Sequence, residues 1–153
     1  MRRLLMILLL LVSVSAASAA DVTTGRVVKV LPLLLDRKGH AALSPSLFDR
    51  DAYQAYLRQH TNEISAVRFD ILWSVVPAAP TKLKLRLELH GTGPDGLPRA
   101  TTLEAGITPH FFRHWTSLTL GGDDLKKFGD VTAWRVTLWS GDQQIAQQNS
   151  FLW

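Results

Sequence analysis

Apolar and polar residues alternate through two long segments of the chain, and this alternation predicts β-strands. In residues 82–90 (KLKLRLELH), every second residue is leucine, and the residues between them are charged or histidine. In residues 67–75 (VRFDILWSV), the apolar set also recurs at every second position, and Leu72 is the one misfit. Because successive side chains of a strand point to opposite faces, each segment predicts a strand with one face in a core and the other in water.

A less regular strand is predicted at the start of this pattern. Residues 27–35 (VVKVLPLLL) are almost continuously apolar, are interrupted by Pro32, and end at the turn-like sequence Asp36-Arg37-Lys38-Gly39. Proline has no backbone N–H to donate to a neighbouring strand. We therefore expect an edge strand here, or a bulge at Pro32.

The segment that follows, SPSLFDRDAYQAYLRQH, predicts a helix over about residues 46–59. Ser44 can cap a helix that begins at Pro45, or Ser46 can cap a shorter one. One face of this helix collects residues at helical spacing, and we expect that face, with its aromatic side chains, to point inward. Its members are Phe48, Ala52, Ala55, Tyr56 and Gln59.

The second half of the chain predicts shorter strands and a closing hairpin. Weaker strand patterns lie at residues 100–107 and 116–120, and residues 121–127 predict a single helical turn that crosses between two sheets. Residues 131–140, a turn at Gly141-Asp142, and residues 145–153 predict a β-hairpin. About seven short strands separated by turns, with only one good helix, favour an antiparallel sandwich over a parallel α/β sheet.

The hairpin segment WRVTLWSGDQQIAQQNSFLW resembles the terminal hairpin of bacterial immunoglobulin-like and fibronectin-III-like domains, in which a tryptophan-containing strand runs through a Gly-Asp turn into the last strand. The resemblance covers about the last 25 residues and implies a mostly β, antiparallel immunoglobulin-like sandwich. The helix would then be an insertion between the first two strands. The chain also resembles short exported bacterial proteins, which implies no particular activity.

The N-terminus has the three zones of a secretory signal peptide. Arg2 and Arg3 precede a largely apolar stretch of 11 residues, Leu4 to Val14, and small residues follow as far as Ala20. A helix of this length spans about 16 Å, against a hydrocarbon core of roughly 30 Å, so it is too short for a membrane anchor. We expect cleavage after Ala19 or Ala20, a signal peptide at residues 1–20, and one domain at residues 21–153 in the periplasm or outside the cell, with no membrane span.

Charge and cysteine content narrow the function classes. Without Arg2 and Arg3, the 17 Lys+Arg become 15 against 13 Asp+Glu, a net charge of +2, and the basic residues are dispersed. This distribution argues against nucleic-acid binding. With no cysteine in the chain, packing alone must stabilise the exported domain, and neither a disulfide nor a cysteine-ligated metal is available.

No motif of catalysis or metal binding stands out. The chain has no GxSxG turn, phosphate-binding glycine loop or HExxH helix. His110 and His114 have the spacing of a helical metal site, but Pro109 and the following strand favour an extended segment, in which the two side chains would be about 13 Å apart. Asp123-Asp124 and Asp49-Asp51 are expected as first-turn charges of helices. We therefore predict no metal site, no cofactor and no catalytic residue.

Aromatic residues provide the candidates for binding. The alternation places Trp73 and Trp134 on core faces, whereas Trp139 lies opposite the core set of its strand and Trp153 ends the chain. Exposed aromatic rings are favoured at sugar-binding and protein-binding surfaces. Trp139, together with Tyr53 on the helix, is therefore the candidate binding site for a protein or carbohydrate partner outside the cytoplasm.

These patterns favour an exported, non-catalytic binding or interaction module. Two alternatives stay open: a small exported enzyme of unrecognised type, and a small outer-membrane β-barrel, since barrel strands also alternate and often end on an aromatic residue. Gln147 and Asn149 argue against the barrel because they occupy the positions that would face lipid.

Overall fold

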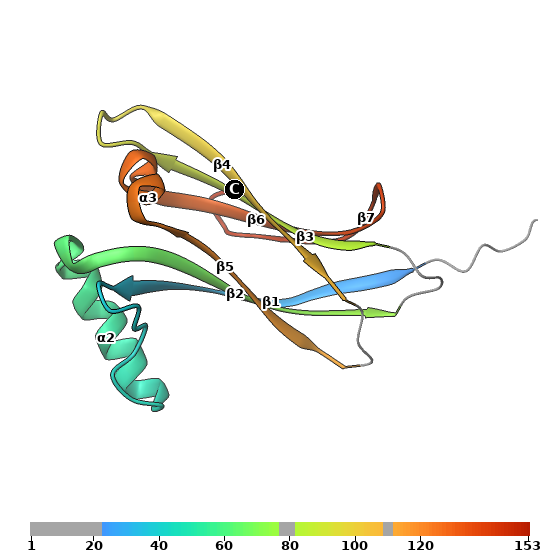
Figure 1. The fold of residues 1–153 in the computed structure, drawn as a ribbon, viewed down its shortest axis with the longest axis horizontal. Helices are drawn as coiled ribbons and strands as arrows, with labels where there is room; N and C mark the ends of the chain where they lie inside the picture. The colour runs from blue at the N-terminus through green and yellow to red at the C-terminus, as the bar shows by residue number, and fades with distance from the viewer. Residues whose placement is uncertain (1–22, 77–81, 109–111) are drawn as a thin grey trace, which may run out of the picture.

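The computed structural model describes residues 23–76, 82–108 and 112–153. The predicted signal peptide, with Ala19 and Ala20, lies outside the described residues, and so does His110. Within the described ranges, the strands form two separate antiparallel sheets that stack face to face, rather than one closed sheet (Figure 1). The prediction of a mostly β, antiparallel sandwich is confirmed. None of the described helices is long and apolar enough to cross a membrane.

The first sheet has three strands in the order β1-β2-β5, and the second has four in the order β4-β3-β6-β7. The three-stranded sheet contains β1 (Thr24–Asp36), β2 (Ile64–Val76) and β5 (His114–Gly121). The four-stranded sheet contains β3 (Leu83–Thr92), β4 (Pro98–Ile107), β6 (Asp130–Ser140) and β7 (Gln143–Asn149). Every neighbouring pair is antiparallel.

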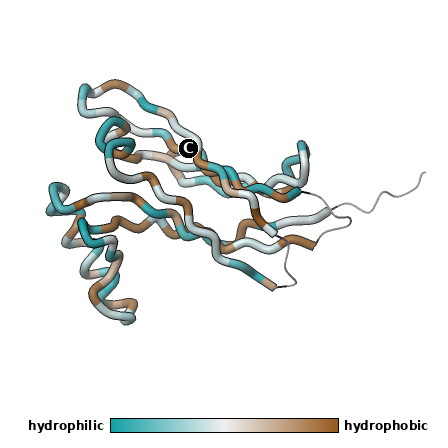
Figure 2. The backbone as a smooth tube through the Cα atoms, viewed as in Figure 1, coloured by the Kyte–Doolittle hydropathy of each residue, from teal (hydrophilic) through white to brown (hydrophobic). Residues whose placement is uncertain are grey.

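The core lies between the sheets and is built from the alternating residues that the sequence pattern singled out. Leu85, Leu87 and Leu89 of β3 are fully buried, as are Phe69 and Ile71 of β2. The intervening polar residues lie on the outer faces, where Arg86 pairs with Glu104 across β3 and β4. The misfit Leu72 points to the outer face of its sheet, opposite the half-exposed Trp115 of β5. Figure 2 shows hydrophobic and hydrophilic positions alternating along the strands.

Strand β1 is an edge strand, as Pro32 predicts. Its two irregularities lie at Val27/Lys29 and Leu35/Asp36 and not at the proline. Leu34 turns both its N–H and its C=O away from β2, toward the side chain of Gln54. Pro32, two residues earlier, therefore has its nitrogen on the same outer side, where no neighbouring strand would accept a hydrogen bond from it.

Helix α2 (Leu47–Gln59) follows β1, and the 3-10 turn η1 (Thr61–Glu63) joins it to β2. Ser46 is the N-cap and accepts a hydrogen bond from the Asp49 N–H, so the shorter of the two predicted helices forms. The predicted inward face is wrong: Phe48 is 81% exposed and Tyr56 is 40% exposed. The buried side chains of α2 are Gln54 and Leu57.

Hydrogen bonding to the strand edge decides this orientation. Gln54 is buried because its amide satisfies the edge of β1, and Leu57, three residues later on the same side of the helix, is fully buried with it. The first turn of α2, with Leu47 and Phe48, projects away from both sheets (Figures 1 and 2).

Helix α3 (Gly122–Phe128) connects β5 of one sheet to β6 of the other, which confirms the predicted crossing turn. Asp123 and Asp124 lie in its first turn, and Lys126 and Lys127 in its last, as the helix dipole favours. Phe128 is buried in the core and anchors the helix.

The predicted C-terminal hairpin is formed by β6 and β7, but β7 ends at Asn149. Phe151 and Leu152 are therefore exposed, rather than extending the strand. The chain turns at Ser150, whose C=O accepts from the Trp153 N–H. The indole of Trp153 then stacks on His90, with the ring centres 4.1 Å apart, and lies under the guanidinium of Arg135.

Candidate binding cleft

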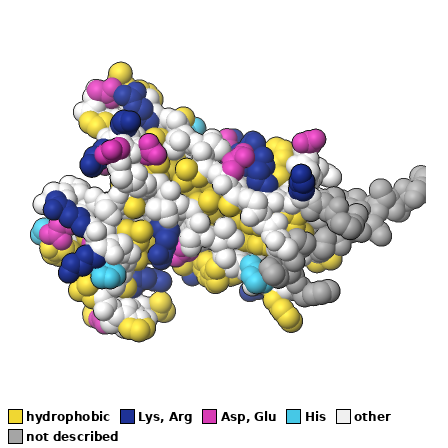
Figure 3. Space-filling view, in the orientation of Figure 1, with side chains coloured by type: hydrophobic (Ala, Val, Ile, Leu, Met, Phe, Trp, Pro, Cys, Tyr) yellow, Lys and Arg dark blue, Asp and Glu magenta, His cyan; other side chains and the backbone are white. Residues whose placement is uncertain are grey.

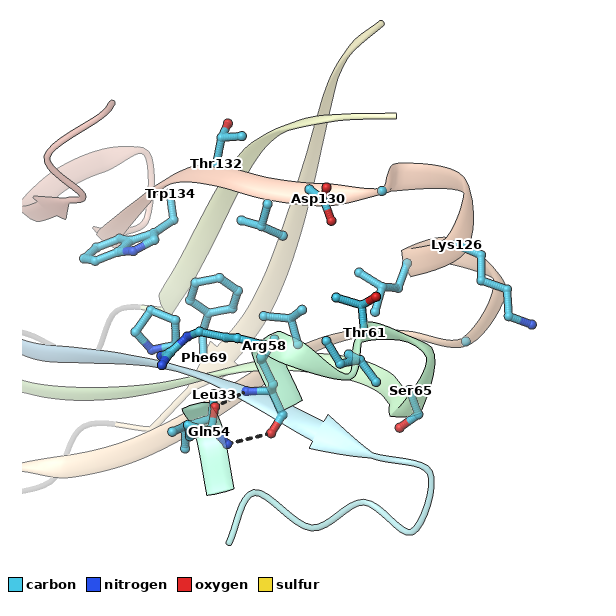
Figure 4. A pocket seen from close by; sticks show the side chains of 18 of the residues that line it. Leu33, Gln54, Arg58, Thr61, Ser65, Phe69, Lys126, Asp130, Thr132 and Trp134 are labelled. Carbon is cyan, nitrogen blue, oxygen red and sulfur yellow. Dashed lines mark hydrogen bonds between the residues drawn. The ribbon is translucent and has the colours of Figure 1, made fainter. Parts of the chain in front are cut away.

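The two sheets are close together at one end of the sandwich and diverge at the other. At the closed end, β1 approaches β6 and β7 so nearly that a Cβ atom on Gly25 would lie 2.7 Å from side-chain carbons of Leu138 and Ile145. At the open end, a cleft of about 1040 Å³ lies between the edge of β1 and the first half of β6 (Figure 4). The connections α2–η1 and α3 form its two flanks.

The floor of the cleft is the uncovered side of the hydrophobic core. Phe69 of β2 is completely buried beneath it. Above Phe69, the cleft is lined by apolar side chains that pack against the core and are only partly buried: Leu34, Leu125, Val131 and Trp134. A partly covered apolar surface in a concavity is the usual floor of a binding site, because a ligand can remove it from water.

Basic side chains surround the mouth of the cleft. Arg58 comes from the last turn of α2, Arg37 from the turn after β1, and Lys126 from α3, whereas Asp130 is the carboxylate among the lining residues. Arg37 donates to the Asn62 C=O at 2.9 Å, and Lys126 pairs with Asp123 at 3.1 Å. In the described part of the chain, no carboxylate lies within ion-pair distance of Arg58. Figure 3 shows basic side chains, with acidic ones among them, on both sides of this end of the molecule. The mouth therefore favours an anionic group.

The β1 side of the cleft is held by Gln54. Its Oε1 accepts from the Leu34 N–H at 2.8 Å, and its Nε2 donates to the Leu34 C=O at 2.9 Å (Figure 4). The Nε2 also donates to the Ala41 C=O at 2.8 Å. These bonds fasten α2 along the strand edge. They also place Arg58, one helical turn after Gln54, at the mouth.

The β6 side of the cleft is a strand that its neighbour, β7, pairs with over only part of its length. Pairing between β6 and β7 begins at Ser140/Gln143 and ends at Arg135/Asn149. One more residue is held by Ser150, which donates its N–H to the Trp134 C=O and accepts from the Trp134 N–H through its hydroxyl. On this side of residues 130–133, no strand of the described chain lies alongside β6.

The two residues predicted as a binding site lie outside the cleft and apart from each other. Trp139 is on the outer face of the four-stranded sheet, where its ring lies 5.0 Å from the guanidinium carbon of Arg86 and its Nε1–H donates to Thr137. Tyr53 is on α2 and donates its hydroxyl to Asp36 at 2.8 Å, a bond that raises the pKa of Tyr53 to about 12. The Asp36 carboxylate also accepts from the backbone N–H groups of Lys38 and His40. Both aromatic side chains therefore have partners within the domain.

Sequence reasoning missed two tryptophans. Trp134 was expected in the core, and its position does face inward, but the divergence of the sheets leaves it as a wall of the cleft. Trp115 is 51% exposed on the outer face of β5. Its position opposite to the parity of the buried Leu118 and Leu120 was a signal that could have identified it.

The histidines make contacts of several kinds. The ring of His114 lies 6.1 Å from that of Trp73, His60 stacks on Tyr56, and His40 lies 3.5 Å from the Asp36 carboxylate. Across residues 23–76, 82–108 and 112–153, no three His, Asp or Glu side chains are grouped in a way that would hold a metal ion.

The comparisons with known proteins find no counterpart. No protein-family model matches the chain, and no curated protein or solved structure shows significant similarity to it. The geometry of the cleft therefore carries the argument about function.

Proposed function

We propose that this protein is an exported, non-catalytic binding module, and that the cleft at the open end of the sandwich holds an apolar, negatively charged part of its ligand. The observation that carries this proposal is the combination of an uncovered apolar floor with a basic mouth. Apolar burial supplies affinity, and the cations select the charge of the ligand and speed its encounter.

The domain is proposed to be an immunoglobulin-like sandwich with α2 inserted between its first two strands. The strand order supports this assignment. In constant-type immunoglobulin domains, the first, second, fourth and fifth strands form one sheet, and the third, sixth and seventh form the other. Here the fourth strand pairs with the third instead of the fifth, and all other pairings correspond. Sandwiches of this kind serve widely as binding modules, although a fold alone does not establish a function.

The proposed location is the periplasm or the exterior of the cell, and it rests on the signal-like N-terminal sequence. Fractionation tests it directly: the mature protein should be recovered outside the cytoplasm, with a new N-terminus at residue 20 or 21. A full-length chain retained in the cytoplasm would contradict this part of the proposal.

Binding of anilinonaphthalene sulfonate tests the cleft, because this probe combines an apolar ring system with one negative charge. We expect saturable binding of about one probe per chain to the native protein. Trp134→Ala should weaken it at least about tenfold, because truncating a buried aromatic anchor costs about 2 kcal/mol. Thermal unfolding of the variant checks that it remains folded.

Two matched tryptophan substitutions serve as controls. Trp115→Ala removes an exposed indole from the outer face of the other sheet, and Trp139→Ala removes the candidate that the sequence suggested. Neither should change the dissociation constant by more than about twofold. If Trp134→Ala binds the probe as tightly as the native protein does, the cleft is not the binding site.

A further inference from the structure

We propose that the natural occupant of this cleft is an extended peptide segment, apolar with acidic residues, that adds a strand to the free edge of β6. This inference rests on the proposed function, since it names the class of ligand that the same cleft would take. In such β-augmentation, main-chain hydrogen bonds give affinity and alternate side chains give specificity.

The free edge of β6 is the first observation. Beyond Trp134, the chain turns at Ser150 and β7 no longer lies beside β6. Asp130, Val131 and Ala133 are therefore paired on one side only, with β3, and Thr132 lies at the irregularity in that pairing. These four residues span about 13 Å at roughly 3.3 Å per residue, enough for the central part of a short peptide strand. An added strand would continue the line of β7 along the same edge.

The edge of β1, on the wall of the cleft opposite β6, is not available to an added strand. On β1, Pro32 offers no N–H, and the Gln54 amide satisfies both backbone groups of Leu34. Proteins commonly protect edge strands in these ways against unwanted pairing. At this cleft, β1 is closed to an added strand, whereas β6 is open.

The side chains beside the free edge match a strand that is apolar on one face. An added strand would direct every second side chain toward the cleft floor, where Trp134, Val131 and Leu125 are only partly buried. Arg58 and Lys126 at the mouth are placed to meet acidic residues of the peptide. Phe151 is fully exposed and Leu152 is 71% exposed directly after Ser150, which lines the cleft, so the apolar surface extends beyond the cleft itself.

This combination favours a peptide over an acyl chain with an anionic head group. An acyl chain would cover the floor and meet the cations, but it would leave the main chain of residues 130–133 without a partner. A peptide satisfies the floor, the cations and the free edge together. Acyl binding is therefore an alternative outcome of the test.

The experiment uses the mature exported protein and a displayed library of random 12-residue peptides, with sodium decanoate as the acyl probe. Peptides are selected on the native protein and synthesised with and without N-methyl groups at alternate residues. Selected peptides should compete with anilinonaphthalene sulfonate and should slow amide hydrogen exchange within residues 130–133. N-methylation should weaken binding at least about tenfold, because it removes the main-chain hydrogen bonds of a strand.

A pair of double variants tests the charge of the mouth. Arg58→Glu with Lys126→Glu reverses two cations that line the cleft, and binding of acidic peptides should fall about tenfold. Arg50→Glu with Lys127→Glu makes the same change in net charge on the same two helices outside the cleft, so its effect should be about twofold or less.

The outcomes separate this inference from the proposed function. If no selected peptide slows exchange within residues 130–133, or if N-methylated peptides bind equally well, strand addition is wrong. If decanoate displaces the sulfonate probe in that case, the cleft remains a binding site but for an acyl ligand. If the sulfonate probe itself does not bind in the cleft, the proposed function fails first.

Discussion

Gln54 provides a sharp test of how the open end is built, because one polar side chain fastens α2 to the edge of β1. The side chain is 3% exposed and makes three hydrogen bonds, two to Leu34 and one to Ala41. Gln54→Met keeps the length and most of the volume of the side chain but removes all three bonds. Because volume is conserved, the cavity contribution should be small.

The expected loss follows from the number of bonds. A buried hydrogen bond contributes a net of about 1 kcal/mol, so removing three should lower the free energy of unfolding by about 3 kcal/mol. For a domain of this length, each kcal/mol shifts the melting temperature by about 3–5 °C, so Gln54→Met should lower it by about 10 °C. Gln59→Met, an exposed position on the same helix, should change it by no more than about 2 °C.

Chemical denaturation and thermal melting of the three proteins measure this difference. Amide exchange adds a local reading, because the Leu34 N–H loses its acceptor in Gln54→Met and should exchange faster. If Gln54→Met is as stable as Gln59→Met and the Leu34 amide is still protected, the helix is held by apolar packing of Leu57 and not by the Gln54 amide.

Gln54→Glu extends the test through pH. The carboxylate still accepts from the Leu34 N–H, but it faces the carbonyl oxygens of Leu34 and Ala41 without a proton to donate. Burial and these two oxygens should raise the pKa of the introduced carboxyl. At neutral pH this variant should be less stable than Gln54→Met, and the difference should shrink as the pH falls and the carboxyl gains a proton. A difference that does not depend on pH would refute this account.

Three further outcomes are expected elsewhere in the domain. Gly91→Ala should cost about 2–3 kcal/mol, because the new Cβ would lie 2.3 Å from the Asp130 carbonyl oxygen, whereas Gly106→Ala, with open space around it, should be neutral within about 0.5 kcal/mol; equal melting temperatures would contradict the β3–β6 geometry. Two hydrogen bonds from Arg135 lower the pKa of Glu88, so the stabilisation is fully present above about pH 4.5 and is lost as the pH falls through the lowered value. Glu88→Gln should therefore lose about 1 kcal/mol at neutral pH, and its difference in stability from the native protein should shrink as the pH falls below 4.5. In a Trp153→Ala background, Glu88→Gln should cost less stability at neutral pH, because the Trp153 indole covers the Arg135 guanidinium. A double-mutant cycle of Glu88→Gln and Trp153→Ala with no coupling would exclude this effect.

The strand pattern could be predicted from the sequence because it depends on a local property. In β2 and β3, alternation decides which side chains face the core, and the buried sets in the structure are the predicted ones. Pro32 likewise predicted an edge strand or a bulge, because its missing N–H has the same consequence in any sheet, and the edge position is the one found. The helical turn at residues 122–128 and the hairpin of β6 and β7 followed from equally local signals of charge and turn formation.

The orientation of α2 could not be predicted in this way. Hydropathy selected the face with Phe48 and Tyr56, but the face that is buried carries Gln54 and Leu57. The deciding interaction is with Leu34 at the edge of β1, 20 residues away in the chain. An amide is favoured over an aromatic ring at this position because it forms hydrogen bonds with the free backbone groups of the edge. A pattern of apolar residues contains no information about such an edge.

The sequence by itself determined the strand-rich composition of the domain and the inward faces of its central strands, because each depends on residues close together in the chain. Only the tertiary structure decided where the two sheets diverge, that Trp134 becomes a wall of the cleft, and that Arg37, Arg58 and Lys126 all line it. These features depend on where the edge strands β1 and β7, which differ in length, stop pairing with their neighbouring strands. The register of distant segments sets that geometry, and no local pattern encodes it.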